Sequence, residues 1–378
     1  MNVDSICEFR NTINNDSPLI NCQLQNYEGV DLWNIVCSAM DWVEVSSSWL
    51  SQRNGPEICH DFYSDSMNLI FYLSAVDMLY EGVSQLYRVF YGILAGKKNV
   101  VLMENAKGVF SDIYYCKDDV TYFKELRAIF GEHSVKLNLS ELVYPPEKRK
   151  EHLDDRWFAS WSYGYSDGIP NKIFIYNRTP GISPIQLEID VNEVVLLADT
   201  VYSWIPKITD KLKKLETQRM NELKKSKWKS FSKDDYENHI AFLLKENCNR
   251  SNNDWYRIAL HEIQLILKCN VKHDIVTKYK ELAYNTLDMI DSAIRNVDNV
   301  DIDELEPKEI SSMPHDIYKT YGALCDLAID NIDSQDYVIW GDQLREYVKD
   351  IINVDDSMDL DDQYVLITAA LLRIENRL

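Results

Sequence analysis

Apolar residues recur at the three- and four-residue spacing of an α-helix over most of this 378-residue chain. Two N-terminal segments, Asp31 to Leu50 and His60 to Leu94, show the pattern most clearly. Asp31 can cap the first helix, while aromatic side chains on much of the circumference of the second predict a helix buried on several sides. Asp118 and Asp119 can start a third helix, and we expect the three helices to pack as a bundle.

The periodicity changes between residues 151 and 190. Short aromatic and β-branched runs, separated by turns that contain Gly and Pro, predict a small antiparallel sheet over Arg156–Tyr165, Lys172–Tyr176 and Ile185–Ile189. Helical periodicity returns at Val191, with Pro206 as a kink or boundary. It continues in six further segments at about 233–248, 254–269, 273–297, 315–332, 337–352 and 360–377.

These patterns predict a mainly α fold. We expect an N-terminal helical bundle over residues 1–150 and a small β insertion over 151–190. A basic connecting helix over 191–230 then leads to an acidic C-terminal helical domain over 231–378. Internal repeats of fixed period are not visible in the sequence, which argues against a regular solenoid.

Charge is distributed unevenly along the chain. The formal net charge is −21, and residues 298–378 contain 20 acidic and 6 basic residues, a net of −14. Residues 207–229 contain nine basic and three acidic residues, a net of +6. Because a strongly acidic field repels phosphate backbones, any nucleic-acid interface must be local.

The eight cysteines are dispersed, without the paired spacing of zinc sites or of disulfide frameworks, and we expect reduced thiols. The first 18 residues lack the order of basic and then apolar residues that marks a secretion signal. No window of 18 residues is continuously apolar. We therefore expect a cytoplasmic protein with no membrane partner.

Motifs for nucleoside triphosphates, dinucleotides, serine hydrolases and zinc proteases are absent from the sequence. His261, Glu262, Cys269 and His273 offer metal-ligand atoms, but their spacing along a helix separates them and the ligand set is short. The acidic run from Asp355 to Asp362 lacks the central Gly and the final Glu of a calcium loop. We expect no metal and no cofactor.

One pair of residues suggests chemistry that needs no metal. Arg127 and His133 are separated by five residues, and a His near neutral pKa can move the proton of a ribose 2′-hydroxyl while an Arg stabilises the phosphorane charge. The pair resembles the Arg–His signature of the higher-eukaryote-and-prokaryote nucleotide-binding (HEPN) superfamily. That resemblance implies a metal-independent ribonuclease of a bacterial toxin or phage-defence system, with its site at a homodimer interface.

A second match, Arg53 and His60, is the reserve pair. Asn54 follows its Arg, as in many family members, but Gly55 and Pro56 exclude one continuous helix. Arg127 lies in a predicted helix, but Ala128 takes the place of the polar residue after it. Its side chain converges with that of His133 only if the helix ends or bends near Gly131.

Two functional hypotheses follow. The first is an endoribonuclease with RNA as substrate, acting as a homodimer. The alternative is a non-enzymatic interaction or regulatory protein that binds a basic protein partner, for which the acidic C-terminal domain is suited.

The basic segment from Ile208 to Ser230 has two interpretations. Its apolar residues Leu212, Leu215, Met220 and Leu223 can form a packed stripe, which leaves lysines free to project. It is either an RNA-phosphate tether or a charged counter-surface to the acidic C-terminal region. The candidate RNA-binding residues are Lys213, Lys214, Lys224 and Lys225.

Overall fold

The computed structural model describes residues 3–14, 19–132, 137, 139–152, 155–162, 170–298, 300–302, 305–307, 313–329, 335–355 and 357–378, with side chains except at 20–21, 132, 140 and 335–340. The mainly α fold with one small antiparallel sheet is confirmed. The chain divides into two compact units. The N-terminal unit is Met1–Asn15 with Leu24–Leu215, and the C-terminal unit is Asp16–Gln23 with Glu216–Leu378.

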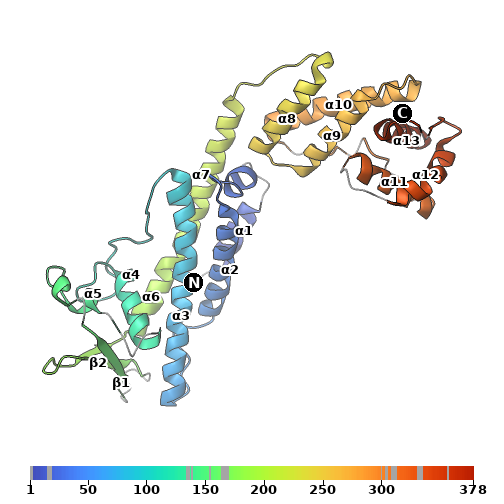
Figure 1. The fold of residues 1–378 in the computed structure, drawn as a ribbon. Coiled ribbons are helices and arrows are strands. Elements are labelled where there is room, and N and C mark those ends of the chain that lie inside the picture. Colours follow the sequence, from blue (N-terminus) through green and yellow to red (C-terminus); the bar gives the residue numbers. More distant parts are fainter. Residues whose placement is uncertain are drawn as a thin grey trace. The chain divides into compact units, whose positions relative to one another are not determined.

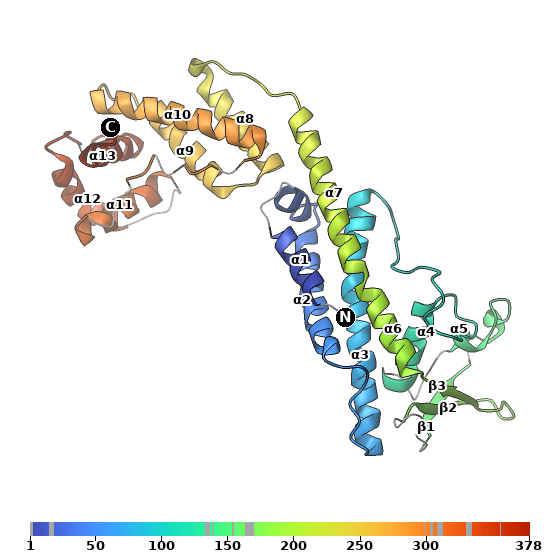
Figure 2. The same ribbon diagram turned by 180° about the vertical axis from the view of Figure 1, so that it is seen from behind.

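The predicted N-terminal helices are present, with their caps. Asp31 accepts a hydrogen bond from the Asn34 amide at 3.1 Å and starts α2 (Leu32–Ser51), while Asp118 accepts one from the Thr121 amide at 2.8 Å and starts α4 (Asp119–Arg127). The long apolar segment forms α3 (Phe62–Tyr87), and then η2 (Arg88–Gly92) and η3 (Ile93–Ala95). Gly96 ends it in the left-handed conformation. α3 contacts α2, α4 and α6 (Figures 1 and 2).

Helix α1 (Asp4–Ile13) lies in a polar, Asn-rich N-terminal segment where no helix was predicted. Ile6, Phe9 and Ile13 are buried on one face of it, and the Ile6 amide donates to the Tyr202 hydroxyl at 3.2 Å. The π-helix η1 (Leu19–Leu24) follows. Short helices α5 (Ser140–Val143) and η5 (Arg149–His152) precede the sheet.

The sheet has the strand order β1 (Trp157–Trp161), β2 (Lys172–Asn177), β3 (Ile185–Glu188), and both pairings are antiparallel, as predicted. Alternate residues of each strand turn into the core, which buries Trp157, Ile173, Ile175 and Leu187. Lys172 lies opposite Glu188 in the register of β2 and β3, and their side chains form an ion pair at 3.2 Å.

Helices α6 (Val191–Tyr202) and α7 (Trp204–Lys225) are separated at Ser203 rather than at Pro206. Pro206 occupies the first turn of α7, where backbone N–H groups have no partner within the helix, so proline is tolerated there.

The C-terminal unit contains all six predicted helices and the short η6 (Lys233–Asp235). Ten consecutive residues of α13, Gln363 to Leu372, are buried, so this helix forms the centre of the core. Of the helices in the described ranges, none combines the length and apolar character that a membrane span needs. The helices are α8 (Tyr236–Arg250), α9 (Asp254–Lys268), α10 (Asp274–Asn296), α11 (His315–Ala328), α12 (Gln335–Val348) and α13 (Leu360–Ile374).

Candidate functional site

Arg127 is the last residue of α4, and it is paired with a carboxylate. Its Nη1 donates to Asp77 Oδ2 of α3, and the two side chains are 27% and 9% exposed. The α-helical hydrogen-bond pattern then changes into the π-helix η4 (Ala128–Glu132). The chain therefore leaves α geometry at Ala128, three residues before Gly131. His133 lies outside the described residues, so its approach to Arg127 stays a prediction.

The reserve pair has separate surroundings. The Arg53 guanidinium lies 4.1 Å from the ring centroid of Trp49 and donates to the Trp49 carbonyl at 3.0 Å. His60 is exposed and has a φ of 61°, directly before Asp61, which caps α3 by accepting from the Ser64 amide at 2.9 Å. Arg53 thus contacts Trp49 of α2, and within the described part of the chain no hydrogen bond or ion pair joins it to His60.

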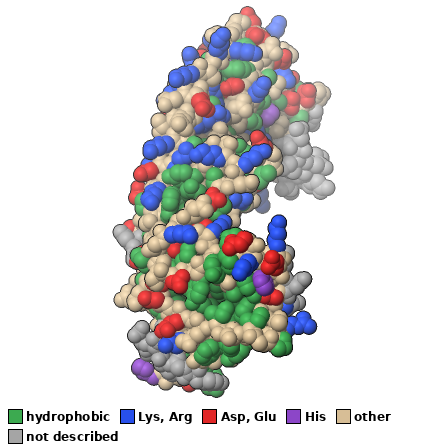
Figure 3. Space-filling model, turned by 90° about the vertical axis from the view of Figure 1, so that its left-hand side faces the viewer, with side chains coloured by type: hydrophobic (Ala, Val, Ile, Leu, Met, Phe, Trp, Pro, Cys, Tyr) green, Lys and Arg blue, Asp and Glu red, His purple; other side chains and the backbone are tan. Residues whose placement is uncertain are grey.

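The candidate RNA-binding lysines lie on exposed positions of α7. Lys213 forms an ion pair with Glu8 of α1 at 2.9 Å. The apolar stripe is largely confirmed, because Leu212, Leu215 and Leu223 are buried while Met220 is half-buried. On the face drawn in Figure 3, Lys and Arg side chains lie among Asp and Glu side chains, so charges of both signs mix there.

The candidate metal ligands among His261, Glu262, Cys269 and His273 do not come together in one site. Glu262 is buried in the core of the C-terminal unit, whereas the adjacent His261 is exposed. Across the described ranges, no group of three or more His, Cys, Asp or Glu side chains could hold a metal ion.

An apolar surface site lies along helices α2 and α3. Two grooves of about 570 and 380 Å³ follow this helix pair, and Met78 lines both, so they adjoin. Four large apolar side chains in them are exposed, which is uncommon for contiguous apolar groups on a monomer. They are Trp42 (52%), Val45 (59%), Phe71 (59%) and Met78 (37%).

The lining residues follow a repeat of three and four residues on both helices. On α2 the series runs Ile35, Ala39, Trp42, Ser46 and Trp49, and on α3 it runs Phe71, Ala75, Met78, Gly82 and Gln85. This is the spacing with which helices present side chains to a neighbouring helix in a coiled coil. The helix pair therefore offers an open seam to a third helix.

Small residues at the base of the groove let α2 and α3 approach closely. A Cβ on Gly82 would lie 2.7 Å from Val43 Cγ2 and 3.1 Å from the Ala39 carbonyl oxygen. Only glycine fits this crossing point.

The groove also contains polar groups. Gln85 lines it, and the buried Gln85 Oε1 has no hydrogen-bond partner among the described residues. Asp77 and Glu81 lie beside it, paired with Arg127 and Lys124 respectively. An incoming N–H donor would satisfy the Gln85 oxygen.

Comparisons with protein-family models, with curated proteins and with solved structures find no match to this chain. The resemblance of Arg127 and His133 to the HEPN signature therefore stays a prediction.

The groove was not predicted from the sequence, because the apolar residues around the circumference of α3 were expected to be buried. Only part of that circumference is buried: Tyr63, Met67 and Phe71 are exposed by 69%, 49% and 59%. The sequence did contain a signal for the groove, because α3 has apolar residues at heptad spacing in addition to the stripe that faces the core.

Proposed function

We propose that this protein is a helical interaction module that binds an amphipathic helix of a partner protein in the α2–α3 groove. The exposed line of Trp42, Val45, Phe71 and Met78 carries the proposal. Apolar side chains at helical spacing in a groove between two helices are the usual receptor for such a helix. Burying them would contribute about 25 cal/mol for each Å² of apolar surface.

The charge of the surroundings favours a basic partner. Over their full lengths, α2 and α3 contain five acidic residues and no Lys, Arg or His: Asp41, Glu44, Asp65, Asp77 and Glu81. Arg10, Lys124 and Arg127 pair with four of these carboxylates, and Arg53 and Arg88 also line the grooves. The remaining attraction therefore comes mainly from the N-terminal unit as a whole, which has 28 acidic and 20 basic residues, a net charge of −8. We expect basic residues to flank the apolar stripe of the partner helix.

Site-specific photo-crosslinking in the source cell tests the proposal. A crosslinking amino acid at Trp42 or at Phe71 should capture the same protein segment, and that segment should be an amphipathic helix with basic flanks. Leu196 of α6 is the matched control because it is 50% exposed outside the groove. Identical products from Phe71 and Leu196 would contradict the groove assignment.

A synthetic peptide of the captured segment then allows the affinity to be measured. Trp42→Ala should weaken binding by about 30-fold, since an anchoring tryptophan contributes about 2 kcal/mol or more. Leu196→Ala should leave the affinity unchanged, and both variants should keep the wild-type melting temperature. If the captured segment belongs to a second copy of this chain, light scattering will show a dimer that Trp42→Ala dissociates.

A metal-independent ribonuclease is the second candidate, favoured by the position of Arg127. This Arg ends α4 directly before the π-helix that leads to His133, and 27% of its side chain is exposed. A half-buried guanidinium can bind a phosphate after it leaves Asp77. RNA would then be the substrate, with a second copy of the chain completing the site.

Cleavage of single-stranded RNA in EDTA tests this candidate. Arg127→Ala and His133→Ala should each abolish cleavage with the fold intact, whereas Arg53→Ala and His60→Ala should retain it. Cleavage that persists in the first two variants and is lost in the others would move the site to the reserve pair. Absence of cleavage by the wild-type protein would eliminate the ribonuclease.

A further inference from the structure

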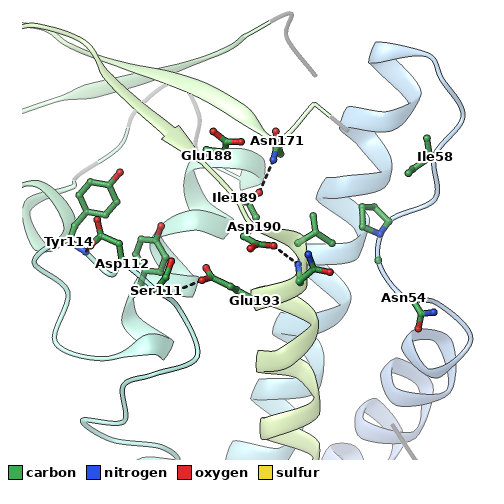
Figure 4. Close-up of a pocket in the computed structure, with 15 residues that line it drawn as sticks. Asn54, Ile58, Ser111, Asp112, Tyr114, Asn171, Glu188, Ile189, Asp190 and Glu193 are labelled. Carbon is green, nitrogen blue, oxygen red and sulfur yellow. Dashed lines mark hydrogen bonds between the residues drawn. The ribbon is translucent and has the colours of Figure 1, made fainter. Parts of the chain in front are cut away.

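A second pocket lies in the N-terminal unit, where β3 ends and α6 begins (Figure 4). Its volume is about 380 Å³, which falls within the usual range for small-molecule sites. Three segments distant in sequence form it. They are residues 54–58 between α2 and α3, residues 111–122 around the start of α4, and residues 171–193 from β2 to α6.

The pocket is strongly acidic. Asp112, Glu188, Asp190 and Glu193 line it, and its described lining residues include no Lys, Arg or His. Lys172, outside the lining, pairs with Glu188 at 3.2 Å. Three carboxylates therefore face the pocket without a cation recorded beside them in the described structure.

Backbone amides hold these three carboxylates in place without neutralising them. Asp112 accepts from the Tyr114 amide, Asp190 from the Asn192 amide and Glu193 from the Ser111 amide, each at 2.8 Å. A carboxylate can accept several hydrogen bonds, so acceptor capacity remains on each. The arrangement is a preformed set of anionic acceptors.

Asn171 provides an independent indication of a ligand. The residue is 3% exposed and lines the pocket, and its Nδ2 donates to the Ile189 carbonyl at 2.9 Å. Its buried Oδ1 has no hydrogen-bond partner among the described residues, which costs about 1–3 kcal/mol. A ligand N–H group would supply the missing donor.

The aromatic lining points to the same class of ligand. The Tyr114 and Tyr122 rings line the pocket with centroids 6.1 Å apart and planes at 28°. Aromatic faces attract organic cations. The carboxylates are distributed around the cavity, and within the described ranges no three of them are close enough to hold a metal ion.

We propose that this pocket binds a small organic cation with several N–H donors, an ammonium or guanidinium compound. Its N–H groups would bridge Asp112, Asp190 and Glu193 and donate to Asn171 Oδ1. Charge-assisted hydrogen bonds of this kind are about twice as strong as neutral ones. The site is separate from the α2–α3 groove and does not depend on the function proposed for it.

Isothermal titration calorimetry on the full-length protein tests the proposal with agmatine, spermidine and Nα-acetylarginine amide. At least one should bind, and Glu193→Gln and Asp112→Asn should each weaken that binding by about tenfold, because they remove charge but keep an acceptor oxygen. Glu104→Gln is the matched control, since Glu104 is exposed outside the pocket. Asn171→Leu should weaken binding as well, with circular dichroism as the check on folding.

The panel distinguishes the sources of the cation. Tighter binding of agmatine or spermidine assigns the site to a free amine, whereas tighter binding of acetylarginine amide assigns it to an arginine side chain of a protein. Tetramethylammonium, which keeps the attraction to the aromatic faces but has no N–H group, should bind more weakly than the compounds with N–H donors. The proposal is overturned if none of the three compounds binds, if Glu193→Gln and Glu104→Gln have equal affinity, or if Mg²⁺ or Ca²⁺ binds in their place.

Discussion

Glu262 should make the stability of the C-terminal unit depend on pH. Its side chain is buried among α9, α10 and α13, and it accepts hydrogen bonds from Tyr364 at 2.6 Å and from Tyr279 at 3.1 Å. Burial raises the pKa of Glu262 from 4.5 to about 7, although the tyrosine hydrogen bonds oppose that rise. The folded protein therefore holds this proton more tightly than the unfolded chain does.

The direction of the pH effect follows from that difference. Below about pH 4.5 the carboxyl is protonated in both states and has no differential effect. As the pH rises to about 7, the unfolded chain loses the proton first, so the free energy of unfolding falls by an amount on the order of 3 kcal/mol. Above pH 7 the loss is complete and constant.

Glu262→Gln removes the ionisation but keeps an oxygen that can accept from both tyrosines. We expect this variant to match the wild type near pH 5 and to exceed its stability at pH 8, in urea unfolding followed by tryptophan fluorescence. The transition of the C-terminal unit is identified as the one that Leu366→Ala shifts, because Leu366 is fully buried there. Glu281→Gln, at an exposed position on α10, controls for the loss of one charge. Parallel pH profiles for wild type and Glu262→Gln would refute the reasoning.

Three further changes have defined outcomes. Gly82→Ala should destabilise the N-terminal unit by about 1–2 kcal/mol, because overpacking against Val43 and the α2 backbone outweighs the gain in helix propensity. An unchanged melting temperature would contradict the close approach of α2 to α3 at this position. Arg250→Met should cost about 3 kcal/mol in urea unfolding, since Arg250 is 1% exposed and donates to Glu246, to the Arg295 carbonyl and to Ser226. Replacing four exposed lysines of α7 by Glu should abolish any salt-sensitive RNA affinity in filter binding. The melting temperature should stay nearly unchanged, as expected for exposed ion pairs. Destabilisation without an effect on RNA binding would instead support charge pairing. The residues reversed are Lys213, Lys214, Lys224 and Lys225.

The fold could be predicted where its determinants are local. Asp31 and Asp118 cap α2 and α4 as expected, since an acidic side chain and the first helical turn suffice to form a cap. The strands were recognisable from aromatic and β-branched runs between turns. Helix α1 was missed because it is short and polar, and because its three apolar residues become informative only when they pack against other helices.

The surface sites depend on contacts that no local pattern contains. The α2–α3 groove needs two heptad patterns placed side by side, and the acidic pocket needs Ser111 to meet Glu193, 82 residues away. The Arg127 and His133 motif was visible in the sequence, but its spacing could not indicate that Asp77 pairs with the guanidinium.

Composition gives the net charge of −21, but it could not indicate the different environments of the carboxylates that contribute to this charge. Asp77 is paired with an Arg, whereas Asp112 and Glu193 are anchored by backbone amides in a pocket lined by no cation in the described structure. Glu262 is buried between two tyrosines with a raised pKa. Asp77 therefore compensates the charge of an Arg, Asp112 and Glu193 attract a cation, and Glu262 favours its protonated form. These roles differ because tertiary neighbours set the partner and the dielectric surroundings of each carboxylate. Cation binding is therefore expected at the pocket, where Asp112, Asp190 and Glu193 have no cation recorded beside them in the described structure, and not uniformly over the acidic surface.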